Sequence, residues 1–299
     1  MAASPVAVIG AGAIGGVAAA ALVDAGHPVT LCVRTPVDGL RLTDPAGRSR
    51  DVAVEVATDP ATVGPLDAVI FATKNHETES AAPWLAALCR PGTTVVVAQN
   101  GLDRAEVVRA LAPTATVAGA VVYIGAERTS PGRVTHYGSE TLIVADGATG
   151  ALIEGLFAGS FMNVKRTSDL ASAAWRKLLG NVVANPLTAL TLRRSEVFAE
   201  PSVATLAEGL LAEAAAVARA DGADITDEDT ARLLDAVRGQ RGDAGSSMLY
   251  DRLGGRPMEW DTITGEVVRR AARHGLAVPR HETILALLRA VDGRPLPSG

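Results

Sequence analysis

Three glycines near the N-terminus constrain the fold of this chain more than any other feature. Gly10, Gly12 and Gly15 form the sequence G-A-G-A-I-G, directly after the apolar run Val6 to Ile9 and directly before an alanine-rich stretch. Between a strand and a helix, such glycines permit a tight turn, a close approach of the backbone to a pyrophosphate, and close packing of the helix on the strand. We therefore expect a dinucleotide to bind with its phosphates at the helix N-terminus. The candidate contact residues are Gly10, Gly12, Ala13, Ile14 and Gly15.

The kind of dinucleotide is indicated by the residue after the second predicted strand, Val29 to Val33. Proteins that bind NAD usually place a carboxylate there to hold the ribose 2′-hydroxyl. This chain has Arg34 instead, and a guanidinium can pair bidentately with a 2′-phosphate. Arg34 therefore favours NADP and NADPH, although a solvated loop arginine would give the same sequence.

The first half of the chain has the pattern of an α/β fold. Short β-branched runs alternate with stretches rich in alanine and leucine, which is typical of βαβ units and a parallel sheet covered on both faces. The predicted strands are Val6 to Ile9, Val29 to Val33, Ala68 to Ala72 and Thr94 to Ala98. Between residues 117 and 144 the pattern changes to strands separated by a Ser-Pro-Gly turn and a Tyr-Gly turn, so we expect antiparallel strands that extend the sheet.

The second half has helical periodicity from Ser168 to Arg289, with loops near residues 221–229 and 239–245. A length of 299 residues also favours two domains over one. The sequence therefore predicts an N-terminal Rossmann-type NADP-binding domain over 1–167 and a C-terminal all-helical domain over 168–299. The helical domain is expected to carry the substrate-binding and catalytic residues.

Charge and composition argue against several classes of protein. A net charge of −5 does not supply the positive field that binding to nucleic acid needs. The uncharged run Val6 to Val23 is better explained by the strand, turn and helix above than by a membrane span. The two cysteines, Cys32 and Cys89, lie in apolar stretches and form no secreted disulfide framework, which favours the cytoplasm. The five histidines have no metal-ligand spacing, so no metal site is expected.

Lysine is scarce in this chain, which makes each lysine informative. Only Lys74, Lys165 and Lys177 are lysines among the 28 basic residues. Arginine cannot give up its proton in a protein, whereas lysine can act as a general acid when burial tunes its pKa. Lys177 is followed at intervals of four by Asn181 and Asn185 on a predicted apolar helix, so the three form one polar stripe. Such a stripe lines a cleft or forms a hydrogen-bond network between packed helices.

Two further polar residues follow predicted parallel strands. Lys74 comes after the strand Ala68 to Ala72, and Asn100 comes after the strand Thr94 to Ala98. Ligands of open α/β sheets bind at the carboxyl ends of the strands, so both residues are expected near the cofactor and the substrate. The competing interpretations are loop residues without a ligand and, for Asn100, a cap on the next helix.

Taken together, these segments resemble the ketopantoate reductase family, the 2-dehydropantoate 2-reductases, over essentially the whole chain. In the first half the resemblance is carried by GAGAIGG, TKNHET, AQNG and SPGRVTHYG. In the second half it is carried by WRKLLGNVVANPLTAL from Trp175, SSMLYDRLGGRPMEWDTITGEVVRRA from Ser246, and HGLAVPRHETI from His274.

The resemblance implies NADPH-dependent reduction of a 2-keto acid to a 2-hydroxy acid. Lys177 would protonate the carbonyl oxygen, and Glu259 would hydrogen-bond the substrate hydroxyl or orient the lysine. The implied substrate-binding residues are Lys74, Asn100, Asn181, Asn185 and Ser247, of which Lys74 and Asn100 would also contact the cofactor. The competing interpretations are that Ser247 caps the helix from Met248 and that Glu259 belongs to a solvated helix start.

Two positions differ from the family pattern, because Ala244 and Ser195 stand where amides are usual. The favoured substrate is ketopantoate, reduced to pantoate for pantothenate and coenzyme A biosynthesis. The alternatives are another keto acid, a β-hydroxyacid-type dehydrogenase, and an NADPH-binding sensor without catalysis. The sequence leaves the oligomeric state open, with a homodimer as one option.

Overall fold

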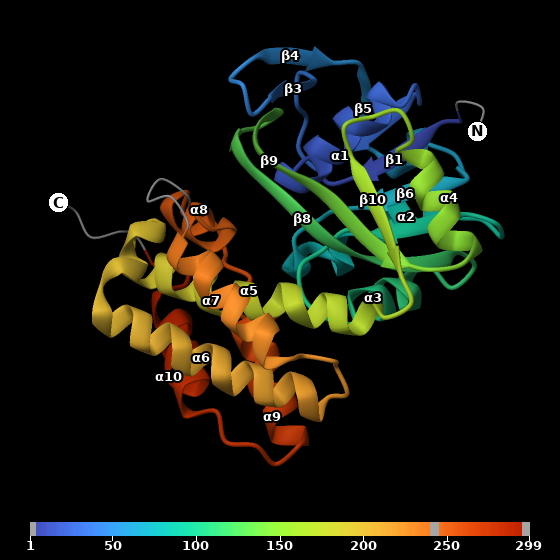
Figure 1. Cartoon of the computed structure of the whole chain (residues 1–299). Helices are drawn as coiled ribbons and strands as arrows, with labels where there is room; N and C mark the ends of the chain where they lie inside the picture. The colour runs from blue at the N-terminus through green and yellow to red at the C-terminus, as the bar shows by residue number, and fades with distance from the viewer. Residues whose placement is uncertain (1–3, 240–244, 295–299) are drawn as a thin grey trace. The chain divides into compact units, whose positions relative to one another are not determined.

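The chain folds as two units, Met1–Leu170 and Ala171–Gly299. A computed structural model describes residues 4–239 and 245–294 (Figure 1). The boundary between the units lies at the start of the long helix α5 (Leu170–Thr191). The assignment of cofactor binding to residues 1–167 and of substrate binding to 168–299 stays a prediction.

The first unit is built on a ten-stranded mixed sheet. Its strands follow the order β4-β3-β9-β8-β7-β6-β1-β2-β5, and β10 pairs with β9. The central strands β2 (Val29–Cys32), β1 (Val6–Ile9), β6 (Ala68–Phe71) and β7 (Thr94–Val97) are parallel. They agree with the predicted strands except for one residue at the carboxyl end of three of them. Every residue of β1, β6 and β7 is buried, as expected for strands covered on both faces.

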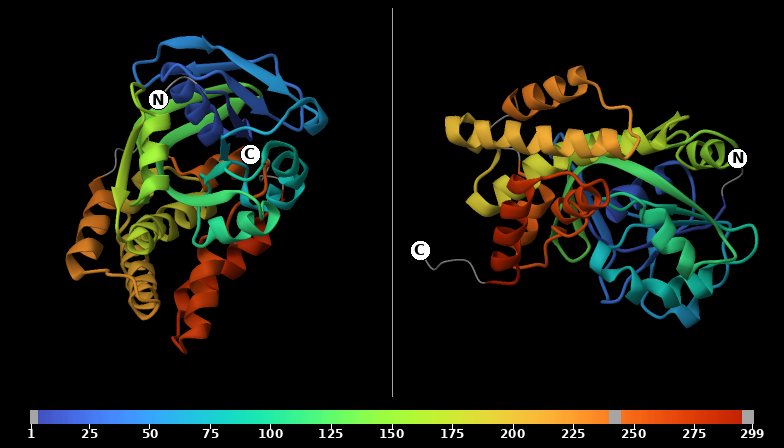
Figure 2. Two further views of the ribbon diagram at one scale, coloured as in Figure 1. Left: turned by 90° about the vertical axis from the view of Figure 1, so that its right-hand side faces the viewer. Right: turned by 90° about the horizontal axis from the view of Figure 1, so that it is seen from below.

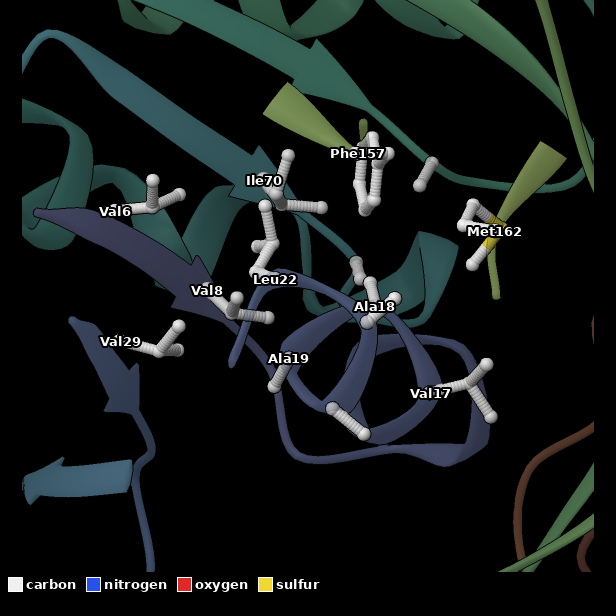
Figure 3. Packing of buried hydrophobic residues seen from close by; sticks show 14 of the residues in the cluster. Val6, Val8, Val17, Ala18, Ala19, Leu22, Val29, Ile70, Phe157 and Met162 are labelled. Carbon is white, nitrogen blue, oxygen red and sulfur yellow. The ribbon is translucent and has the colours of Figure 1, made fainter. Parts of the chain in front are cut away.

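Helices cover the two faces of this sheet. Val6 and Val8 of β1 point to one face, where they pack with α1 (Ala13–Asp24) and α4 (Ala148–Leu156). Ala7 and Ile9 point to the other face and pack with α2 (Ala82–Leu88) and α3 (Arg104–Leu111). Figure 3 shows the first of these cores, in which the alanines of α1 allow the helix to lie close to the strands. The apolar run Val6 to Val23 thus forms β1, the glycine-rich turn and most of α1.

The predicted antiparallel region is a single long hairpin, β8 (Thr116–Ser130) and β9 (Arg133–Ala145). The turn predicted at Ser-Pro-Gly is present, with Gly132 at a φ of 70°. The turn predicted at Tyr-Gly is wrong, because β9 continues through it. Gly138 pairs with Gly125 while His136 pairs with Ala126, so Tyr137 is the extra residue of a β-bulge. A glycine inside a strand often marks such a bulge.

Four short strands have no counterpart among the predicted ones. They are β3 (Leu40–Thr43), β4 (Ser49–Val52), β5 (Val54–Ala57) and β10 (Asn163–Thr167). They lie at the margins of the sheet, and most of their residues are polar or partly exposed. Short 3-10 turns, η1 (Pro60–Thr62), η2 (Asn75–Glu77) and η3 (Glu79–Ala81), complete the first unit.

The second unit is helical throughout the residues that the structure describes, as predicted (Figures 1 and 2). After α5 come η4 (Ser195–Ala199), α6 (Pro201–Ala220), α7 (Asp227–Gly239), α8 (Ser247–Leu253), α9 (Thr264–Arg273) and α10 (Pro279–Val291). Helix α6 packs against α7, α9 and α10. It is long and apolar enough to cross a bilayer, with a mean hydropathy of 1.2. Its residues Leu210, Ala214 and Ala218 are fully buried within the unit, as in a core helix.

Candidate functional site

The glycine-rich turn has the geometry that a bound pyrophosphate requires. Gly10 has a φ of 105°, and a Cβ there would lie 2.9 Å from the carbonyl oxygen of Ala72. A Cβ on Gly15 would lie 1.9 Å from the carbonyl oxygen of Gly10. Gly12 is the N-cap of α1, and a Cβ there would meet open space. The backbone is therefore tightly packed on its inner side and accessible at the helix N-terminus, where phosphates bind. These residues fit a dinucleotide.

The parallel sheet brings the other predicted cofactor residues to the same edge. Strands β2, β1, β6 and β7 are neighbours in that order, and their carboxyl ends lie side by side. Arg34 follows β2, Lys74 follows β6, and Asn100 follows β7. Lys74 and Asn100 are half-buried, whereas Arg34 is exposed. The structure thus gathers at one edge the residues that the sequence places after separate strands.

Hydrogen bonds that the sequence does not reveal fix the loops at this edge. The Asn75 side-chain amide donates to the backbone carbonyl of Asn100 over 2.9 Å, which joins the ends of β6 and β7. The buried Gln99 amide donates to the carbonyl of Thr73 over 3.0 Å and to the hydroxyl of Thr78 over 2.9 Å. Asn75 belongs to the TKNHET segment and Gln99 to the AQNG segment. Their positions next to Lys74 and Asn100 are the only sequence signal that they hold the loops in place.

Asn100 does not cap the helix that follows. The N-cap of α3 is Asp103, three residues further on, in a left-handed conformation with a φ of 54°. The alternative interpretation of Asn100 as a helix cap is therefore wrong.

Arg34 has a partner that the sequence does not indicate. Its guanidinium lies 3.0 Å from the carboxylate of Glu77, which ends η2. The side chains are 73% and 34% exposed, so this is a surface pair at the ribose end of the predicted cofactor site.

The polar stripe of the second unit lies on α5. Lys177 and Asn181 are half-buried and Asn185 is 4% exposed. Leu178, Leu179, Val182 and Val183 of the same helix are buried in the core of the unit. Burial lowers the pKa of Lys177 from its usual 10.5 to about 8. The lysine therefore carries a proton at neutral pH that it releases more easily than an exposed lysine does.

Asn185 has an unsatisfied donor. Its side-chain nitrogen is buried and has no hydrogen-bond partner within the part of the chain that the structure describes. A buried donor without an acceptor costs about 1–3 kcal/mol. Helix α5 continues past Asn185 through Pro186 to Thr191.

Two competing interpretations of the C-terminal candidates are wrong. Glu259, between α8 and α9, is 8% exposed and so does not belong to a solvated helix start. Ser247 is exposed and does not cap α8, because the cap is Ser246. The Ser246 hydroxyl accepts from the backbone N–H of Leu249 over 3.1 Å and lies 2.7 Å from the hydroxyl of Thr188 on α5. Ser246 thus ties the start of α8 to α5, a role that a sequence with two consecutive serines cannot assign.

Of the two positions that depart from the family pattern, the structure describes only Ser195. Ser195 is 3% exposed at the start of η4. Ala244 lies outside the described residues.

A buried polar cluster holds the first turns of α5. The Trp175 indole donates to the carboxylate of Asp221 over 3.0 Å, and His274 lies 3.1 Å from the same carboxylate. Arg270 of α9 also pairs with Asp221, and its guanidinium lies 5.6 Å from the centre of the Trp175 ring. Burial alone would raise the pKa of Asp221, but the hydrogen bonds from His274, Trp175 and Arg270 hold it below its usual value. The cluster fixes the segment that carries Lys177 to the helices around it.

Comparison with known proteins identifies the family. Residues 6–148 match the model described as "Ketopantoate reductase PanE/ApbA", and residues 169–292 match "Ketopantoate reductase PanE/ApbA C terminal". The chain is 38% identical to the 2-dehydropantoate 2-reductase of Mycobacterium tuberculosis over 294 residues, which are 98% of this chain and 99% of the relative. The chain belongs to the ketopantoate reductase family.

Other relatives agree with this assignment. The 2-dehydropantoate 2-reductase of Caulobacter vibrioides is 35% identical over 95% of this chain and 98% of the relative. A dimeric ketopantoate reductase from Staphylococcus aureus has a TM-score of 0.86 at 29% identity and covers 96% of this chain and 98% of that one. The resemblance inferred from the sequence and the predicted fold class are thus confirmed. Family membership makes the chain an oxidoreductase and implies a nicotinamide cofactor.

Proposed function

We propose that the chain uses NADPH to reduce ketopantoate to pantoate, the reaction that feeds pantothenate and coenzyme A biosynthesis. The observation that carries the proposal is Lys177, a half-buried lysine with a pKa lowered to about 8 on the helix that also carries Asn181 and Asn185. The relatives from M. tuberculosis and C. vibrioides, which align over nearly their whole length, are named for this substrate.

Lys177 acts as the general acid in this proposal. Reduction of a ketone places negative charge on the carbonyl oxygen, and an ammonium group beside that oxygen stabilises the charge and then supplies the proton. Burial favours this role in two ways. It brings the pKa of Lys177 closer to neutrality, and it removes water that would weaken the interaction with the oxygen.

The amides and the other polar residues bind the substrate. The unsatisfied buried nitrogen of Asn185 donates to a substrate oxygen, which explains why the fold tolerates it. Asn181, Ser247, Asn100 and Lys74 contact the carboxylate and the hydroxyl. Glu259, a buried carboxylate, orients Lys177 or accepts from the substrate hydroxyl.

The first unit holds the cofactor. The backbone from Gly10 to Gly15 and the N-terminus of α1 bind the pyrophosphate, and Arg34 binds the 2′-phosphate. Lys74 and Asn100, after β6 and β7, contact the nicotinamide end. NADPH supplies the hydride when it is bound.

The test is NADPH oxidation by the purified chain with ketopantoate beside a panel of other 2-keto acids, and with NADH as the alternative donor. Selective turnover of ketopantoate is expected. Lys177→Ala should lower kcat about 10²- to 10⁴-fold, while Lys165→Ala, which removes an exposed lysine of β10, should leave it unchanged. Turnover of a different keto acid would reassign the substrate, and full activity of Lys177→Ala would refute the general acid.

Two further properties are part of the proposal. The reaction belongs to the cytoplasm, where NADPH is available. The chain works as a homodimer, in line with the dimeric relative from S. aureus, and measurement of its mass in solution tests this.

A further inference from the structure

The carboxylate of Glu77 lies 3.0 Å from the guanidinium of Arg34. Arg34 stands at the carboxyl end of β2, and Glu77 lies in η2 after the carboxyl end of β6. These two strands flank β1 in the sheet. The ion pair therefore joins the two ends on either side of the strand that carries the glycine-rich turn.

The ion pair places a positively charged group and a negatively charged group at the ribose end of the cofactor site. A guanidinium after the second parallel strand suits the 2′-phosphate of NADPH. A carboxylate at the same place suits the 2′-hydroxyl of NADH, to which it can accept a hydrogen bond. In most dinucleotide sites a single residue after the second strand makes this choice, whereas here the carboxylate arrives from the loop after β6.

We infer that Glu77 is a specificity-determining residue for the cofactor. It competes with the 2′-phosphate of NADPH for Arg34 and offers its own carboxylate to the 2′-hydroxyl of NADH. The chain consequently prefers NADPH less strongly than Arg34 alone would dictate. This inference rests on the proposed binding of a nicotinamide dinucleotide at this edge.

Charge and exposure indicate that Glu77 and a phosphate compete for Arg34, and that the Arg34–Glu77 ion pair is not a fixed structural contact. Both side chains reach solvent, with 73% of Arg34 and 34% of Glu77 exposed, so the pair is weak and can separate when a stronger anion arrives. A phosphate that carries up to two negative charges is such an anion. Glu77 then remains close to the phosphate and repels it, and salt should screen that repulsion.

The test compares cofactor binding by the full chain and by Glu77→Gln, which keeps the size of the side chain and removes its charge. Glu79→Gln is the matched control, since it removes the same charge from an exposed residue two positions further on. The dissociation constants of NADPH and NADH are measured by fluorescence titration. Those of 2′,5′-ADP and 5′-AMP follow by competition, because these probes carry the adenosine end alone and require no catalysis.

Glu77→Gln should bind NADPH and 2′,5′-ADP about three- to tenfold more tightly than the unchanged chain. NADH and 5′-AMP should bind equally or up to about threefold more weakly, because an amide is a poorer acceptor than a carboxylate. The increase in affinity for NADPH should be smaller at high salt. It should also be smaller in the Arg34→Gln background, where Glu77 has no guanidinium to occupy. Glu79→Gln should change neither cofactor.

Three results would overturn the inference. Glu77→Gln could weaken NADPH, which would mean that Glu77 positions Arg34 for the phosphate. Glu77→Gln could bind both cofactors with the same dissociation constants as Glu79→Gln, or its tighter binding of NADPH could persist in full in the Arg34→Gln background. These results are distinguishable from failure of the proposed function, because binding of either cofactor without reduction of any keto acid refutes the function and leaves the binding comparison intact. Binding of neither cofactor would refute both.

Discussion

At the scale of single residues, the proton on Lys177 determines how the reaction responds to pH. Because burial lowers the pKa of Lys177 to about 8, the lysine is charged below that pH and neutral above it. A neutral amine cannot protonate the substrate oxygen. We therefore expect kcat/KM for the keto acid to be level below about pH 7 and to fall about tenfold for each pH unit well above 8. The measurement is a pH profile at saturating NADPH.

The same profile has an internal control. Lys177→Arg keeps a positive charge but cannot give up its proton in this range. It should reduce the rate and remove the fall above pH 8. A wild-type profile that stays level up to pH 10 would contradict the role of Lys177 as the acid.

Which single residues could be recognised from the sequence depended on whether their role is local. Lys177 could be recognised because lysine is rare in this chain and the helical spacing to Asn181 and Asn185 is local. The partnership of Glu77 with Arg34 could not, since the fold brings together residues 43 positions apart. The sequence could not distinguish Ser246 from Ser247 as the cap of α8, because two consecutive serines both satisfy the sequence pattern for a cap. In the structure the cap is Ser246.

At the scale of helices, the cluster around Asp221 holds α5 to its neighbours. The Asp221 and Arg270 side chains are 15% and 7% exposed. Removal of the Asp221 carboxylate leaves the buried guanidinium with Glu266 as its remaining counter-charge and leaves the Trp175 indole without its acceptor. We expect Asp221→Ala to lower the free energy of unfolding by about 2–3 kcal/mol. The measurement is thermal or urea unfolding followed by circular dichroism.

Asp227→Ala is the matched control, because Asp227 also pairs with an arginine, Arg219, but is 97% exposed. Its loss should cost under about 1 kcal/mol. Equal effects of the two variants would mean that the buried cluster contributes nothing special to the packing of α5.

At the same scale, the predictable elements were those with a continuous apolar pattern. The strands β1, β6 and β7 are fully buried, and apart from Thr94 they are apolar runs. The apolar runs end at Gly10, Thr73 and Gln99. The strands β4 and β10 lie at margins of the sheet and carry mostly polar side chains. These strands form because they pair with neighbouring strands, and their own sequences do not indicate it. The partner of β10 is β9, whose bulge at Tyr137 has the sequence pattern of a turn.

For the whole molecule, the division into an α/β unit and a helical unit was predictable, because the period of the apolar pattern changes once along the chain. The order of the ten strands was not. The short strand β3 lies beside β9, about 90 residues later, and only the pairing of Arg41 with Arg133 and of their neighbours shows it. Such contacts depend on the global packing of the sheet and leave no local periodicity.

The two units should also differ in their resistance to acid. In the second unit, burial would raise the pKa of Glu213, but hydrogen bonds from His281 and Arg280 hold it below its usual value. Despite burial, hydrogen bonds likewise lower the pKa of Asp229 to about 2. Burial lowers the pKa of His281. Groups with lowered folded-state pKa values bind protons more readily in the unfolded chain, so each contributes stability that is lost as the pH falls.

The loss begins below pH 6.5, where an unfolded His281 would become protonated, and increases below about 4.5, where the unfolded carboxylates do. In the first unit the carboxylates with lowered pKa values, Asp44 and Asp51, lie on the surface, where water screens their ion pairs. We therefore expect the second unit to unfold at a higher pH than the first.

Tryptophan fluorescence can separate the two transitions. Trp84 belongs to the first unit, and Trp175 and Trp260 belong to the second. The variant Trp84→Phe reports the second unit alone, and its difference from the unchanged chain reports Trp84. During acid titration the signal of Trp84→Phe should change first, at a pH at least about half a unit above the Trp84 signal. Coincident transitions would mean that the units unfold cooperatively, and an earlier change of Trp84 would mean that the exposed pairs of the sheet matter more than the buried groups of the helices.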